Sequence, residues 1–100
     1  MPRLTDEEIT KALEGLPAWT REGESLVRRL TFPSFPDAMA FVVRLSFDAE
    51  ASDHHPDVTV SWRRLTVAWS THSEGGVTQK DVDGARLVDR LLRAPDVGST

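Results

Sequence analysis

The chain has 100 residues, of which 39% are hydrophobic and 28% charged, and it contains no cysteine. This composition fits a single domain over residues 1–100 and excludes a disordered chain, disulfides, thiolate nucleophiles and cysteine-ligated zinc. A net charge of -4, no apolar run near ~20 residues and no apolar N-terminal segment predict a cytoplasmic protein without nucleic-acid or membrane partners.

A first helix is predicted over LTDEEITKALEGLP, residues 4–17. Thr5 can cap it, and Glu8 three residues later completes a capping box. Gly15 and Pro17 end it. Its apolar residues recur at helical spacing and are Ile9, Leu13 and Leu16.

A β-hairpin is predicted next, from AWTRE and SLVRRLTF around a turn at Gly23. The alternation of its second strand is imperfect. One side carries Leu26, Arg28 and Leu30, and the other carries Val27, Arg29 and Thr31.

The strongest helix prediction is SFPDAMAFVVRLSFDAEAS, residues 34–52. Ser34 can cap it, with Asp37 three residues later. It should end near Ser52, because Pro56 disfavours helical backbone at the residue before it. The apolar residues that recur at helical spacing are Phe35, Ala38, Met39, Val42, Val43 and Phe47.

A second hairpin is predicted over VTVSWRRLTVAWS, with its turn at Arg63 and Arg64. Period-two alternation places Val58, Val60 and Trp62 together before the turn, and Leu65, Val67 and Trp69 together after it.

A last helix is predicted over TQKDVDGARLVDRLL, with Thr78 as its cap and Asp81 at its third position. Its apolar stripe comprises Val82, Ala85, Val88 and Leu92. The polar tail RAPDVGST is predicted to fray. The order α-β-β-α-β-β-α predicts an α+β fold, with three helices packed on one face of a four-stranded antiparallel sheet.

The three histidines are the most informative candidates for function. His54 and His55 are adjacent, and in an extended segment they would point to opposite sides, which makes them poor joint ligands for one metal ion. They can still flank a pocket if the chain bends there. Neutral histidine is the natural proton carrier near pH 7, and a carboxylate can fix its tautomer.

Each candidate also has a purely structural interpretation. The histidine pair and His72 fit solvated loops, and Asp81 fits a helix cap. Glu50 fits an exposed helical position. Trp19 and Trp62 fit a core or an interface.

In combination these residues follow the pattern acidic-x3-His-His-Pro-x5-aromatic-x9-His-x8-Asp. It is filled by Glu50, His54, His55, Pro56, Trp62, His72 and Asp81. This pattern, together with THSEGGVTQKDVDGA, resembles the pterin-4a-carbinolamine dehydratases. The resemblance covers nearly the whole chain and implies the same α+β fold, assembled as a homodimer or homotetramer.

The resemblance also implies a reaction. Members dehydrate 4a-hydroxytetrahydropterin to quinonoid dihydropterin and water, so that the tetrahydropterin used by aromatic amino acid hydroxylases is recycled. They use no metal and no redox cofactor. The implied catalytic set is His54, His55, His72 and Asp81. The implied substrate-binding residues are Trp19, Glu50 and Pro56, with Trp19 lining the pocket beside the pterin.

Within this set we expect His55 and His72 to carry most of the proton transfer and His54 to contribute binding and electrostatics. Asp81 would orient a histidine. Two alternatives remain open at this point. One is a non-catalytic dimerisation or interaction module with the same fold. The other is a metal hydrolase or oxygenase built on two histidines and a carboxylate, against which the adjacent pair counts.

Overall fold

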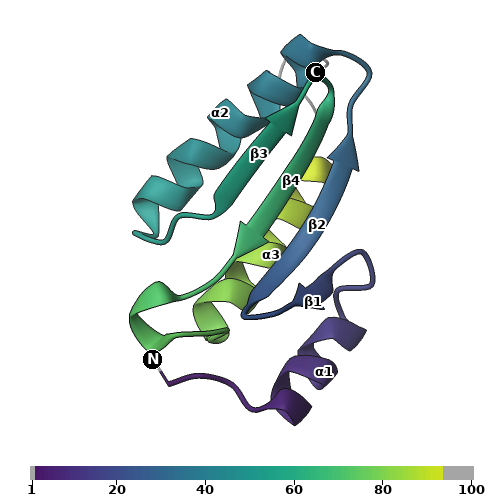
Figure 1. Cartoon of the computed structure of the whole chain (residues 1–100). Coiled ribbons are helices and arrows are strands. Elements are labelled where there is room, and N and C mark those ends of the chain that lie inside the picture. The colour runs from purple at the N-terminus through teal and green to yellow at the C-terminus, as the bar shows by residue number, and fades with distance from the viewer. Residues whose placement is uncertain (1, 94–100) are drawn as a thin grey trace.

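The computed structural model describes residues 2–93, so the predicted tail at 94–100 lies outside the described residues (Figure 1). The elements are α1 (Asp6–Glu14), β1 (Thr20–Glu22), β2 (Ser25–Thr31), α2 (Phe35–Ala51), β3 (Asp57–Ser61), β4 (Arg64–Trp69), a short 3₁₀ turn (His72–Glu74) and α3 (Gln79–Arg93). The predicted α+β class and element order are confirmed. No helix within residues 2–93 is long and apolar enough to cross a bilayer.

The four strands form one antiparallel sheet in the order β1-β2-β4-β3. The register pairs Leu26 of β2 with Trp69 of β4, and Val67 of β4 with Val58 of β3. Side chains on this face of the sheet pack against α2 and α3, which run along the sheet in Figure 1. Ile9 of α1 joins the same core.

The imperfect alternation of β2 has a structural reason. Arg28 faces the helices, and its Nη1 donates a hydrogen bond of 2.6 Å to Oδ1 of Asp89 on α3. Trp19 Nε1 donates to the same oxygen at 2.9 Å. The arginine is therefore accommodated at the edge of the core because it is paired with a carboxylate there.

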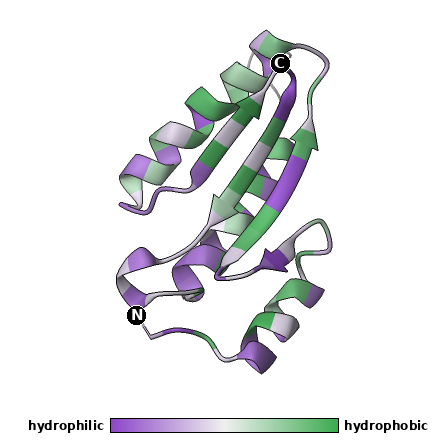
Figure 2. Ribbon diagram, in the orientation of Figure 1, coloured by the Kyte–Doolittle hydropathy of each residue, from purple (hydrophilic) through white to green (hydrophobic). Residues whose placement is uncertain are grey.

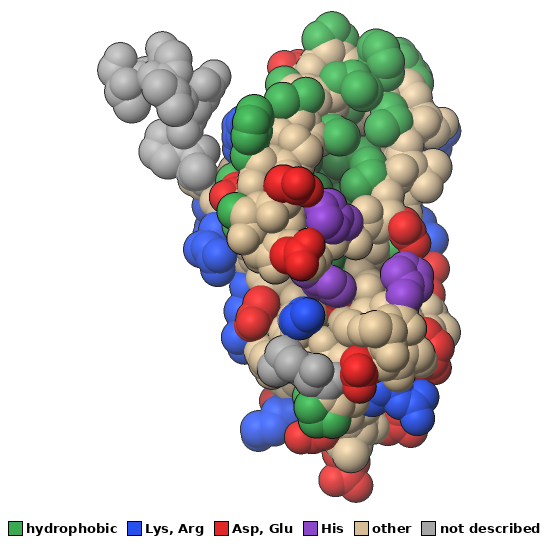
Figure 3. Space-filling model, turned by 90° about the vertical axis from the view of Figure 1, so that its left-hand side faces the viewer, with side chains coloured by type: hydrophobic (Ala, Val, Ile, Leu, Met, Phe, Trp, Pro, Cys, Tyr) green, Lys and Arg blue, Asp and Glu red, His purple; other side chains and the backbone are tan. Residues whose placement is uncertain are grey.

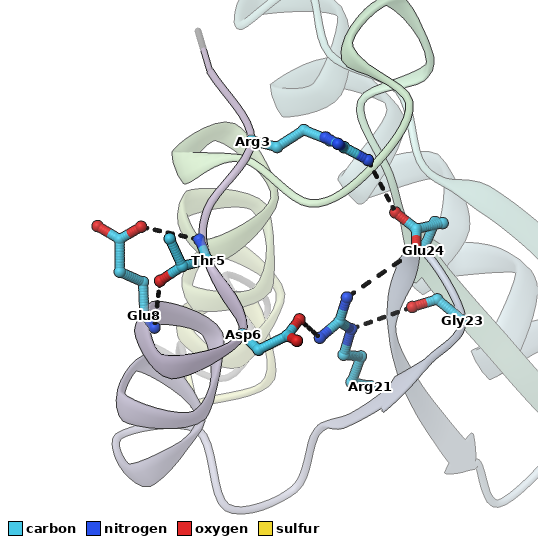
Figure 4. A network of polar contacts seen from close by, with 7 residues as sticks. All are labelled: Arg3, Thr5, Asp6, Glu8, Arg21, Gly23 and Glu24. Carbon is cyan, nitrogen blue, oxygen red and sulfur yellow. Dashed lines mark hydrogen bonds and ion pairs between the residues drawn. The ribbon is translucent and has the colours of Figure 1, made fainter.

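Helix α1 is fixed to the first hairpin by polar contacts (Figure 4). The predicted capping box is present: Glu8 N–H donates to Thr5 Oγ1, and Thr5 N–H donates to Glu8 Oε1. Arg21 Nη1 donates to Asp6 at 2.7 Å, and Arg21 Nη2 lies 3.9 Å from Glu24. Such exposed ion pairs contribute little stability individually.

Helix α2 has apolar residues on two sides. In Figure 2 these residues appear as green stretches that recur along the helix. Its buried side chains are Ala38, Phe41, Leu45 and Ala49. Most of the stripe predicted from the sequence is exposed instead: Phe35, Met39, Val43 and Phe47. Only Ala38 and Val42 of the predicted set pack toward the core.

The turn of the second hairpin is shifted by one residue from its predicted place. Ser61 pairs with Arg64, so Trp62 and Arg63 form the turn. Trp62 is 68% exposed, has a φ of 57° and lies outside β3. The guanidinium of Arg63 lies 4.9 Å from its ring centroid.

Candidate active site

A left-handed turn at the end of α2 delivers the adjacent histidines. Asp53 has a φ of 53°, and its N–H donates to the Glu50 carbonyl at 3.1 Å. His54 N–H donates to the Ala49 carbonyl at 3.1 Å. These two bonds form a Schellman motif, in which Asp53 occupies the position that glycine usually takes. The motif ends the helix and directs the chain toward Pro56 and β3.

His54 is tied to a buried carboxylate. Its Nε2 lies 2.6 Å from Oδ1 of Asp81, which is 0% exposed at the first turn of α3. The other carboxylate oxygen, Oδ2, accepts from Thr71 Oγ1 at 2.8 Å and from the Thr78 N–H at 2.9 Å. Asp81 therefore caps α3 with one oxygen and contacts His54 with the other.

The direction of these hydrogen bonds follows from donor counting. The Thr71 hydroxyl has one proton and donates it to Asp81. The Thr78 hydroxyl must therefore be the donor in its 2.8 Å contact with Thr71. Thr78 Oγ1 in turn accepts from the Lys80 N–H at 3.2 Å. An ionised Asp81 is acceptor-only, so His54 donates from Nε2, and Nδ1 is left to accept or carry a proton.

His55 has a carboxylate partner as well, but an exposed one. Its Nε2 lies 2.7 Å from Oε1 of Glu50, and the two side chains are 57% and 80% exposed. The contact spans the end of α2. It orients the ring without removing it from solvent.

All three histidines meet at one hollow of about 260 Å³. Its lining residues are Asp53, His54, His55, Ser70, Thr71, His72, Ser73 and Lys80. His72 comes from the 3₁₀ turn after β4, which Gly75 closes with a φ of 71°. Figure 3 shows the three imidazoles gathered on one face of the molecule. The structure thus brings together the histidines and Asp81 that the sequence selected.

Trp19 is not brought to this hollow. It is 3% exposed, lies in the core and donates to Asp89, eight residues after Asp81 on α3. Eight residues of helix correspond to roughly 12 Å. The expectation that Trp19 lines the pocket is therefore not met within one chain: the indole satisfies its N–H inside the core, next to Arg28. Glu50 and Pro56 flank the hollow through their histidine neighbours without lining it.

Several residues of the site were not selected from the sequence, and three of them make contacts that shape it or bring charge to it. Thr71 holds Asp81, and Lys80 lines the hollow. Trp69 stacks on His54, with ring centroids 5.4 Å apart and an interplanar angle of 23°. Thr71 and Lys80 each adjoin a selected residue in the chain, but a threonine or lysine beside such a residue is too common to be diagnostic.

Residues 2–93 contain no group of three or more histidines, aspartates or glutamates arranged to hold a metal ion. The hollow offers imidazoles, hydroxyls, one carboxylate and one ammonium group. Such groups can donate and accept protons on a bound molecule.

Known proteins resemble this chain over most of its length. The family described as "Pterin 4 alpha carbinolamine dehydratase" matches residues 2–91. The chain belongs to this family. A relative from Mycobacteroides abscessus, named "Putative pterin-4-alpha-carbinolamine dehydratase", is 52% identical over 92 residues, which are 92% of this chain and 98% of that protein. A relative of the same name from a Roseiflexus species is 47% identical over 90 residues, covering 90% and 97%.

Solved structures show the family fold as well. The crystal structure of a transcriptional coactivator/pterin dehydratase from Brucella melitensis has a TM-score of 0.85 at 35% identity, covering 89% of this chain and 97% of that chain. A pterin dehydratase-like protein identified as a RuBisCO assembly factor in the alpha-carboxysome has a TM-score of 0.61 at 19% identity, covering 77% and 89%. At that identity the likeness concerns the fold alone.

Proposed function

We propose that this protein dehydrates 4a-hydroxytetrahydropterins to quinonoid dihydropterins in the cytoplasm, as a step in tetrahydropterin recycling beside an aromatic amino acid hydroxylase. The observation that carries the proposal is the convergence of His54, His55 and His72 on one hollow, with His54 tied to the buried Asp81. Membership of the dehydratase family supports the same reaction.

The reaction needs one proton donor and one proton acceptor. The bond from C4a to the hydroxyl oxygen breaks, and its electron pair leaves with the oxygen. A general acid protonates that oxygen, so that water departs. A ring nitrogen forms the new double bond to carbon and yields its proton to a general base. One proton is given and one is taken, so no redox partner is required.

The surroundings of the histidines suit different parts of this exchange. His55 and His72 are exposed side chains on the rim of the hollow and are assigned the proton transfers. His54 is half-buried and fixed by Asp81, which suits substrate binding and electrostatic stabilisation. Each well-placed transfer typically contributes ~10²–10⁴-fold in rate.

The direct test is a dehydration assay on an enzymatically or chemically generated 4a-carbinolamine. Formation of the quinonoid product is followed against the spontaneous rate. Acceleration proportional to protein concentration supports the proposal. A rate equal to the spontaneous one, with folded protein and several pterins, refutes it and favours the alternative of a non-catalytic interaction module.

We further propose that the protein is a homo-oligomer, at least a dimer, that uses the exposed side of α2. Phe35, Met39, Val43 and Phe47 recur every four residues there, with Phe47 73% exposed. Figure 3 shows hydrophobic side chains gathered toward one end of the face that bears the histidines. Contiguous apolar patches on monomers are usually small, and larger ones mark interaction sites.

Phe47→Glu is expected to shift the protein toward the monomer, because a charge cannot be buried there without a partner. Light scattering at micromolar concentration measures the mass. Thr10→Glu, at an exposed position on α1, is the matched control and should leave the mass unchanged. A wild-type protein that is monomeric at this concentration would contradict the proposal.

A further inference from the structure

Trp69, the last residue of β4, packs against one face of the His54 imidazole ring. Its side chain is 1% exposed, and its indole ring stacks on the imidazole. Asp81 meets the same imidazole at Nε2. His54 is therefore fixed twice: through Nε2 by the carboxylate, and across one ring face by the indole.

The indole can lie there because α3 has no side chain at Gly84. A Cβ added to Gly84 would come within 2.5–2.8 Å of three ring atoms of Trp69. Real Cβ atoms essentially never approach other atoms under 3.0 Å. Glycine lowers helix stability relative to alanine, so its place inside α3 is explained by this close approach.

The surroundings of the pair show why the indole matters for His54. A second hollow of about 450 Å³ opens between α2 and α3, and His54, Trp69 and Gly84 all contribute to its lining. A smaller side chain at 69 would leave the imidazole free to turn into this space. Trp69 Nε1 has no hydrogen-bond partner among the described residues, which is unfavourable for a buried donor. Filling of the core alone does not require an indole.

We propose that Trp69 is a positioning residue for His54, and that Gly84 is the seat that allows it. The indole face holds the imidazole in the plane in which Nε2 meets Asp81. The effect of Trp69 on the reaction rate rests on the proposed dehydratase function, whereas its effect on the position of His54 does not.

Trp69→Leu and Trp69→Phe test the role of the aromatic face. Ring current from the indole should shift the His54 ring protons upfield of those of His55 and His72 in the NMR spectrum. Trp69→Leu should abolish that shift and lower kcat on the order of 10-fold through misplacement of a site group. Trp69→Phe should retain much of both. Wild-type kcat together with an unaltered His54 spectrum in Trp69→Leu would overturn the proposal.

Gly84→Ala tests the seat. Alanine has the higher helix propensity, so without a steric collision the substitution would stabilise the protein. We expect the opposite, a Tm lowered by several degrees and a displaced His54 signal, because the methyl group collides with the indole. Gly15→Ala is the matched control: the nearest atom to its added Cβ is a backbone oxygen at 3.7 Å.

The double variant Trp69→Leu/Gly84→Ala completes the cycle. In the Trp69→Leu background, Gly84→Ala should no longer lower the Tm, because the collision with the indole is gone. The kcat should stay as low as in Trp69→Leu, because the aromatic face is still missing. Additive losses of Tm in the double variant would overturn the assignment of Gly84. If the wild-type protein accelerates no dehydration, the proposed function fails, and the NMR shifts and the Tm cycle still decide the placement of His54.

Discussion

His55→Ala and His72→Ala are each expected to lower the dehydration rate by at least ~10²-fold, the lower end for a positioned acid or base. Both imidazoles lie on the rim of the hollow, and both side chains are exposed. Truncation therefore leaves no cavity in the core, and the Tm should be nearly unchanged. Steady-state turnover of a generated carbinolamine is the measurement, with circular dichroism to verify the fold.

Glu50→Gln provides the comparison for His55. It keeps the shape of the side chain 2.7 Å from the imidazole but removes its charge. Because the pair is exposed to solvent, we expect a much smaller loss of turnover than from His55→Ala. Wild-type turnover in both histidine variants would refute their assignment to proton transfer.

Asp81→Asn has the second large expected effect, on turnover more than on stability. Asparagine can still accept from Thr78 N–H with its oxygen, but its NH₂ then faces His54. The imidazole would have to accept at Nε2 and carry its proton on Nδ1, the tautomer opposite to the one the carboxylate imposes. We expect a clear loss of kcat for this reason, as in other enzymes in which a buried aspartate orients the catalytic histidine.

Asp37→Asn is the matched control for Asp81→Asn. Asp37 occupies the same third helical position in α2 and is exposed; its N–H donates to Ser34 Oγ, and its carboxylate accepts from the Ser34 hydroxyl. Both substitutions remove a charge at a helix N-terminus, which is worth about 0.3–1 kcal/mol at an exposed position such as Asp37. Only Asp81→Asn should change turnover. If the two variants differ from wild type in stability alone, Asp81 is a helix cap and nothing more.

Much of the fold could be predicted from local patterns. The caps at Thr5 and Ser34, the two hairpins and the stripe of α3 each follow from a few neighbouring residues, and the structure confirms them. The buried side of α2 could not be predicted in the same way. That helix is apolar on two sides, so periodicity alone does not reveal that Phe41 and Leu45 face the sheet.

The sequence predicted that the three histidines and Asp81 lie together, but it did not predict how they pair. Spacing along the chain selected the three histidines and Asp81, but it did not reveal which histidine Asp81 contacts, and the fold pairs it with His54. The contact of Trp19 with Asp89 was not predicted because the two residues are 70 positions apart in sequence. The left-handed backbone of Asp53 was missed because aspartate adopts that conformation only occasionally.

The two oxygens of Asp81 link the folding of α3 to the assembly of the site. One holds the first turn of the helix, and the other holds the imidazole of His54. Whenever that first turn frays, both bonds are lost together, so the fraction of molecules with a competent site cannot exceed the fraction with an intact helix start. The slowest-exchanging amide protons at the beginning of α3 therefore report, in the resting protein, how often the site is disassembled.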